Sequence, residues 1–154
     1  MNIKIVSGGQ TGVDRAALDF ARDANIPSGG WCPPGRLAED GIIPTDYPLQ
    51  EMPEGGYQER TWKNVIESDG TLIIYSRNVS GGTAETFQAA KANRKPFCLI
   101  DAARMSPEKA ATKLTAFMHR HDITCLNVAG PRSSQWSNGY TYTRALLMHW
   151  AANP

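Results

Sequence analysis

Short runs of β-branched and other apolar residues alternate along this chain with longer segments that have helical spacing. The runs at residues 3–6, 71–75 and 96–100 are each followed by a segment of helical spacing. Such alternation is typical of a parallel sheet whose strands are joined by crossover helices. The order of the segments therefore predicts an α/β fold.

The spacing of apolar residues also locates the expected elements. We expect five strands, at residues 3–6, 28–31, 71–75, 96–100 and 123–128, and five helices, at residues 13–24, 60–67, 84–93, from 107 onward and 141–152. Residues 32–56 contain five prolines and no regular period, and so long a structureless stretch is uncommon unless it has a function. The 154 residues suit one domain. We expect a single three-layer domain over residues 1–154, with a mostly parallel five-stranded sheet and helices on both faces.

Charge and composition exclude several classes of protein. The 16 basic and 15 acidic side chains leave a net charge of +1, which does not suit a generally basic nucleic-acid binder. The sequence has no apolar run of about 18 residues, and its N-terminus lacks the apolar stretch of a signal peptide. Three widely spaced cysteines without a CxxC pair argue against a disulfide framework or a zinc site. We therefore expect a cytoplasmic protein with no membrane, nucleic-acid or metal partner.

Glycines gather at the ends of the expected strands. They are Gly8, Gly9 and Gly12 after the first strand, Gly30 in the second extended segment, Gly81 and Gly82 after the third strand, and Gly130 after the last. The carboxyl ends of parallel strands meet at one edge of a sheet, where glycine lets backbone N–H groups approach an anion and the next helix adds partial positive charge. The first turn, GGQTG, is neither a dinucleotide fingerprint nor a P-loop. We expect a small anionic ligand at this edge; alternatively, the glycines only make tight turns.

Polar side chains near these turns are candidates for contacting the ligand. The candidates are Gln10, Thr11, Asp14, Arg15, Trp31, Arg36, Glu39, Asp40, Thr83, Glu85 and Arg132. Threonine hydroxyls can donate to an anion, and arginines in loops can clamp a phosphate or a carboxylate. Asp14 can accept a donor from a ribose or a pterin; alternatively, it only interacts with the dipole of its helix.

Several candidates have a structural interpretation beside the functional one. Arg15 can meet a phosphate or form a surface ion pair. Trp31 can stack on a planar ring or pack internally. Glu39 and Asp40 can anchor a ligand, act as a general base or form a solvated loop pair. Cys32, which lies outside the expected strands, can contact a ligand or a metal, or simply pack as a small residue.

Several blocks of sequence carry a family likeness. SGGQTGVDRAALD at residues 7–19, GGWCPPGR at 29–36, AEDG at 38–41 and NVAGPR at 127–132 resemble the molybdenum carrier family, and the blocks RT at 60–61 and NV at 64–65 match in the same order. The resemblance spans nearly the whole chain. It implies a Rossmann-like domain related to the SLOG group of nucleotide-derived ligand binders, holding the molybdenum cofactor, which is a pterin that carries a phosphate. It also implies a homo-oligomer, a dimer or a tetramer.

The resemblance leaves alternatives to a carrier that binds without turnover. The SLOG group includes phosphoribohydrolases whose loop reads GGxGTxxE with a catalytic glutamate; here Thr86 stands at that position and Glu85 lies one residue early. One alternative is therefore a hydrolase of nucleoside monophosphates with Glu85 or Glu39 as its carboxylate. Others are a nucleotide-sensing domain, with a phosphate-bearing nucleotide as the ligand, and a protein-interaction domain with a vestigial pocket. The aromatic residues Trp136, Tyr140, Tyr142 and Trp150 can form a subunit interface or pack internally.

Overall fold

A five-stranded sheet forms the centre of the molecule. The computed structural model describes residues 2–154. The strands are β1 (Lys4–Val6), β2 (Ser28–Gly29), β7 (Gly70–Tyr75), β8 (Phe97–Asp101) and β9 (Cys125–Ala129). Their order across the sheet is β2-β1-β9-β7-β8, and every neighbouring pair is parallel. The predicted α/β fold is confirmed, with a sheet that is wholly parallel.

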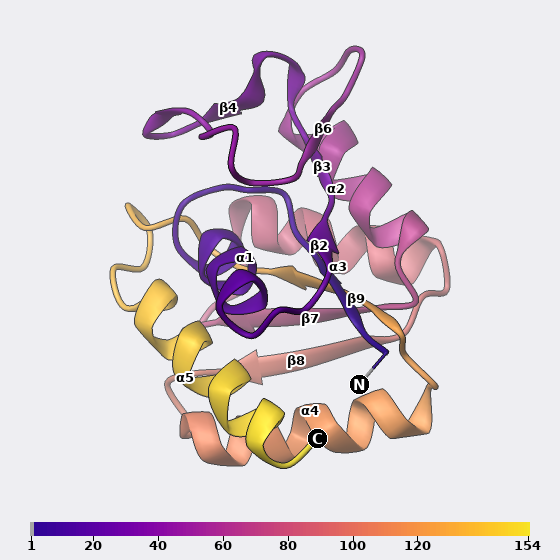
Figure 1. The fold of residues 1–154 in the computed structure, drawn as a ribbon, viewed down its shortest axis with the longest axis vertical. Coiled ribbons are helices and arrows are strands. Elements are labelled where there is room, and N and C mark those ends of the chain that lie inside the picture. The colour runs from indigo at the N-terminus through magenta and orange to yellow at the C-terminus, as the bar shows by residue number, and fades with distance from the viewer. Residues whose placement is uncertain (1) are drawn as a thin grey trace.

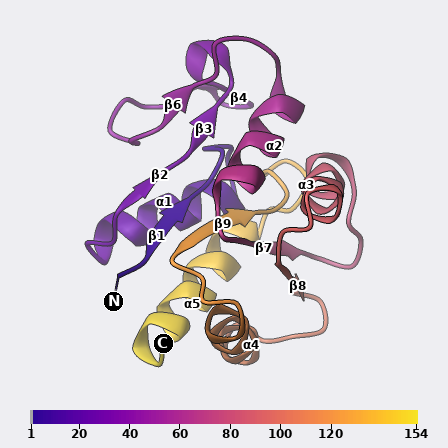
Figure 2. The same cartoon turned by 90° about the vertical axis from the view of Figure 1, so that its right-hand side faces the viewer.

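Five helices cover the sheet on both faces. They are α1 (Val13–Asp23), α2 (Tyr57–Glu67), α3 (Gly81–Ala92), α4 (Pro107–Arg120) and α5 (Gly139–Ala152). Helices α1, α4 and α5 pack together on one face, and α2 and α3 pack together on the other (Figures 1 and 2). This arrangement gives the expected three layers. Within residues 2–154, no helix is long and apolar enough to cross a membrane.

The larger core lies between the sheet and the layer of α1, α4 and α5. Leu72 and Ile74 of β7 belong to it, as alternate residues of a strand share one face of a sheet. Trp150 is buried in this core, and Trp136 and Tyr142 pack against it, which favours internal packing for these three aromatic residues. Tyr140 is partly exposed, and its hydroxyl donates to Asp19.

Three helices begin earlier than the apolar spacing predicts. Helix α3 starts at Gly81 rather than residue 84, and α5 starts at Gly139 rather than residue 141. Glycine has a low helix propensity, so the local pattern favours a loop where the structure has a first helical turn. Helix α2 starts at Tyr57 rather than residue 60, because the Glu59 carboxylate accepts the N–H of Gly56 at 2.6 Å and caps the helix.

The segment that we expected to be irregular contains two small sheets. β3 (Trp31–Cys32) pairs with β6 (Gln50–Glu51), and β4 (Leu37–Ala38) pairs with β5 (Gly41–Ile42) after a short 3₁₀ turn, η1 (Pro34–Arg36). The expected strand at 28–31 is divided at Gly30: β2 belongs to the central sheet and β3 to the small one. This segment forms the upper part of the molecule in Figure 1, and a second core of Leu18, Cys32, Ala38, Ile43 and Leu49 supports it.

Arg36 organises this segment from within. Its guanidinium donates to the backbone carbonyls of Ile43, Pro44, Tyr47 and Leu49 at distances of 2.7–3.1 Å. We predicted that Arg36 could clamp a phosphate. The structure instead places its donors on the carbonyls of a chain segment that has little regular secondary structure of its own.

Replacing Arg36 should therefore loosen residues 37–51. We expect Arg36→Met to lower the free energy of unfolding by about 2–3 kcal/mol, because four carbonyls lose a charged donor. Arg36→Lys should recover little of this loss, since one ammonium group cannot reach all four carbonyls that surround the planar guanidinium. Urea unfolding, together with limited proteolysis of this segment, measures both effects; a lysine variant as stable as the wild type would contradict the role given to the guanidinium.

Candidate functional site

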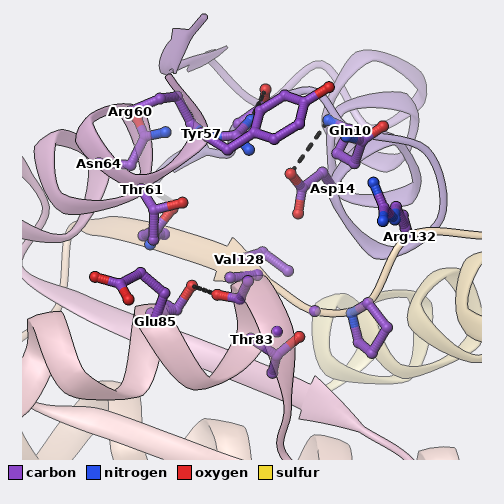
Figure 3. A pocket seen from close by; sticks show the side chains of 18 of the residues that line it. Gln10, Asp14, Tyr57, Arg60, Thr61, Asn64, Thr83, Glu85, Val128 and Arg132 are labelled. Atoms are coloured by element: carbon purple, nitrogen blue, oxygen red, sulfur yellow. Dashed lines mark hydrogen bonds between the residues drawn. The ribbon is translucent and has the colours of Figure 1, made fainter. Parts of the chain in front are cut away.

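A cavity of about 360 Å³ lies where β1 and β9 end and where α3, the helix that follows β7, begins (Figure 3). Four parts of the chain line it: the turn after β1, the start of α3, the end of β9 with the loop that follows, and the first turns of α2. The lining includes Gly8, Gln10, Asp14, Tyr57, Arg60, Thr61, Asn64, Gly81, Gly82, Thr83, Glu85, Asn127, Val128, Gly130 and Arg132. Parallel strands bring these loops together because their carboxyl ends share one edge of the sheet.

The start of α3 presents unsatisfied donors to the cavity. Thr83 is only 3% exposed, and its hydroxyl has no hydrogen-bond partner in the described structure. No side chain caps this helix, so the N–H groups of its first turn are available to a ligand. These donors and the positive end of the helix dipole make this part of the cavity favourable for an anion.

Arg132 adds a cation on another side of the cavity. Its Nε lies 3.5 Å from Oε2 of Glu39. Glu39 also accepts hydrogen bonds from the hydroxyls of Ser134 and Thr11 and from the Ser134 N–H, and these bonds, with Ser134 contributing most, lower the pKa of Glu39. Glu39 thus ties the turn after β1 to the loop after β9, and it positions Arg132 at the cavity.

Asp14 and Arg60 place a buried carboxyl group and a buried guanidinium in the same cavity. Oδ2 of Asp14 accepts the N–H of Gln10 at 3.2 Å, and Nη1 of Arg60 donates to the carbonyl of Gly8 at 2.6 Å. Burial raises the pKa of Asp14 to about 6, although the charge of Arg60 and the Gln10 N–H act in the opposite direction. A Cβ at Gly8 would lie 2.3 Å from Nη1 of Arg60, so a glycine is needed for this approach.

Nine of the predicted site residues line the cavity: Gly8, Gln10, Asp14, Gly81, Gly82, Thr83, Glu85, Gly130 and Arg132. The other nine lie outside its lining: Gly9, Thr11, Gly12, Arg15, Gly30, Trp31, Arg36, Glu39 and Asp40. Arg15 donates to the carbonyl of Gly9 and forms two hydrogen bonds with Asp40, while the ring of Trp31 lies 5.0 Å from Nζ of Lys63. Arg15 thus forms an ion pair with Asp40, and Trp31 is half-buried beside Lys63.

Eight polar residues of the lining are not among the predicted site residues: Tyr57, Gln58, Arg60, Thr61, Asn64, Thr86, Asn127 and Gln135. Arg60, Asn64 and Asn127 lie in blocks that matched the family pattern, and this was the available signal. Tyr57 carried no comparable signal, because it falls before the expected start of its helix. The ring of Tyr57 lies 5.4 Å from the guanidinium carbon of Arg60.

Comparison with known proteins identifies the family. A model of the circularly permutated YpsA SLOG family matches residues 5–151. The chain belongs to this family. A crystal structure from Syntrophus aciditrophicus SB, described as a putative molybdenum carrier protein, is similar to this SLOG chain at 51% sequence identity and a TM-score of 0.94, over 96% of this chain and 93% of that one. No curated protein matches the chain. The predicted SLOG membership and Rossmann-like fold are confirmed.

The side chains considered for hydrolysis or metal binding are held by, or buried in, the protein of this SLOG domain. Glu85 accepts hydrogen bonds from Gln58 and from the indole of Trp62, which hold it at the α2 wall of the cavity. Cys32 is buried in the second core, and burial raises the pKa of its thiol. In the part of the chain that the structure describes, no group of three or more His, Cys, Asp or Glu residues is placed to hold a metal ion.

The buried charge of Asp14 should cost stability at neutral pH. Because its folded pKa of about 6 lies above the ordinary value of 3.8, the folded chain holds this proton more tightly than the unfolded chain. The contribution of the Asp14 carboxyl group to the free energy of unfolding is fully present below about pH 4 and is lost as the pH rises through 6. We expect Asp14→Asn to be more stable than the wild type by about 3 kcal/mol at pH 7.5, with the difference vanishing near pH 4.

Urea unfolding of the two proteins at several pH values between 4 and 8 tests this expectation. Asp23→Asn, at the other end of α1, is the matched control: it removes an exposed ion pair with Arg144, which contributes at most about 1 kcal/mol. An Asp14→Asn variant that is less stable than the wild type at pH 7.5 would show that the carboxylate stabilises the fold.

Proposed function

We propose that this chain is a binding protein for a phosphorylated small molecule, and that the molybdenum cofactor, a phosphorylated pterin, is its first candidate ligand. One observation carries the proposal: an unpartnered hydroxyl, Thr83, and the uncapped start of α3 face a cavity that Arg132 also lines. A buried hydroxyl without a partner costs free energy unless a ligand satisfies it.

The phosphate would lie at the start of α3. The backbone N–H groups of Gly82 and Thr83 and the Thr83 hydroxyl would donate to its oxygens, and Arg132 would supply a charge-assisted hydrogen bond from the loop after β9. A Cβ built on Gly82 meets nothing within 4 Å, so there is open space beside this backbone. Phosphate oxygens can therefore approach the helix end without displacing a side chain.

The rest of the cavity suits the ring system of a pterin. The volume of about 360 Å³ lies within the usual range of about 300–1,000 Å³ for small-molecule sites. Beyond the phosphate donors, the lining combines the apolar Val128 with polar groups of Asp14 and Asn127. The similarity to a solved protein described as a putative molybdenum carrier supports this ligand over other phosphorylated compounds.

A phosphate-bearing nucleotide is the alternative ligand for the same donors. Native mass spectrometry of freshly purified protein, followed by a thermal-shift panel of phosphorylated pterins and nucleoside monophosphates, separates the two. Incubation with nucleoside monophosphates and chromatography for released base tests the hydrolase alternative. The expected homo-oligomer stays a prediction, for which light scattering after size-exclusion chromatography is the measurement.

Placing a negative charge at the start of α3 should abolish phosphate binding without harming the fold. Gly82→Asp has room for its side chain, and an acidic residue in the first turn of a helix interacts favourably with the helix dipole. We expect its Kd for the best phosphorylated ligand of the panel to rise at least about a hundredfold through charge repulsion at the phosphate subsite. Isothermal titration calorimetry measures this change.

Gly82→Asn is the matched control, because it has the same shape without the charge. Its Kd should stay within about fivefold of the wild-type value. If Gly82→Asp binds as tightly as Gly82→Asn, or if no phosphorylated compound binds the wild type, the proposed phosphate site is wrong.

A further inference from the structure

The carboxylate of Asp14 lies inside the cavity, and the protein uses only part of its capacity to accept hydrogen bonds. One of its oxygens, Oδ2, accepts the Gln10 N–H, and Figure 3 shows the carboxylate pointing from α1 into the space above Val128. Asparagine could accept the same backbone donor, so the fold does not require a charged group at this position. A charged, 7% exposed carboxylate with spare acceptor capacity indicates a ligand that donates hydrogen bonds to it.

The groups around Asp14 come from three parts of the chain. Arg60 faces it from α2, Arg15 follows it on α1, and both attract its negative charge. The backbone N–H groups of Gln10 and Gly8, in the turn after β1, also lower the pKa of this carboxyl group, and the Gln10 N–H donates to Oδ2. Arg60 already donates to the Gly8 carbonyl, and Arg15 already donates to Gly9 and Asp40. Neither arginine forms a hydrogen bond with the Asp14 carboxylate, so the acceptor positions that the Gln10 and Gly8 N–H groups leave free are open to a ligand.

Tyr57 adds a flat aromatic surface to the same cavity. Tyr57 is 43% exposed, and Figure 3 shows its ring lining the same cavity as Asp14 and Gln10. A planar heterocycle held by its edge at Asp14 can therefore place its face against an aromatic ring, which is a favourable arrangement for stacking. Asp14 and Tyr57 together suit a flat ring that presents hydrogen-bond donors along one edge.

We infer that Asp14 selects ligands whose ring carries an N–H beside an amino group, as guanine and pterins do. A carboxylate accepts such a pair through two parallel hydrogen bonds, one to each oxygen. Hypoxanthine has the ring N–H without the amino group, and adenine presents an acceptor nitrogen that a carboxylate repels. The inference rests on the proposed function, and it narrows the ligand to one class of heterocycle.

Two nucleotides that differ only in the amino group test this selection. We expect wild-type protein to bind GMP at least about tenfold more tightly than IMP, and more tightly than AMP, in calorimetry at pH 7.5, because one hydrogen bond to a charged group is lost. Asp14→Asn should bind GMP about tenfold more weakly and IMP within about threefold of the wild type. Asp23→Asn should leave both affinities unchanged, and circular dichroism checks that each variant is folded.

Guanosine and inosine complete the experiment, because they carry the same bases without the phosphate. Equal binding of GMP and IMP by the wild type, an unchanged preference in Asp14→Asn, or no binding of any guanine or pterin compound overturns the role of Asp14. If guanosine binds better than inosine while the phosphate of GMP adds no affinity, the selection by Asp14 stands and the proposed phosphate site fails. The two failures are therefore distinguishable.

Discussion

The parallel direction of all five strands of the central sheet is the constraint on which the cavity depends. Because β1, β7 and β9 are parallel neighbours, the turns that follow them meet at one edge, although they lie far apart in the sequence. Each of these turns leads toward a helix, so backbone N–H groups gather where side chains are small. An antiparallel neighbour would send one of the turns to the opposite edge. The sheet thus sets the place of the cavity before any particular side chain is considered.

Helix α2 brings a buried cation to this edge of the sheet. The buried guanidinium of Arg60 reaches the carbonyl of Gly8 and faces Asp14, which joins the two helical layers across the end of the sheet. A carboxylate with a raised pKa beside a buried arginine costs folding free energy. Proteins accept such a cost at sites that bind or react more often than at purely structural positions. The proposed selection of a donor edge gives this cost a function.

Several charged residues of the long segment between β2 and α2 bind other parts of the protein rather than an open site. Arg36 binds four carbonyls, and Asp40 pairs with Arg15. Glu39 joins two turns beside the cavity, and Arg132 is the cation that it positions there. With so little regular structure, this part of the chain needs side-chain donors and acceptors to satisfy its backbone. Its arginine and several of its acids therefore resemble ligand-binding groups in the sequence although they bind other parts of the protein.

The sequence by itself determined the α/β class, the parallel sheet, the existence of five helices and the edge of the sheet at which the cavity lies. These depend on local apolar periodicity and on glycines at strand ends, which are visible in short windows. Only the tertiary structure decided which polar groups face the cavity. The contact of Arg60 with Gly8 joins residues 52 positions apart, and the early start of α3 at Gly81 goes against local helix propensity. Such contacts depend on packing between distant segments, which no local pattern records.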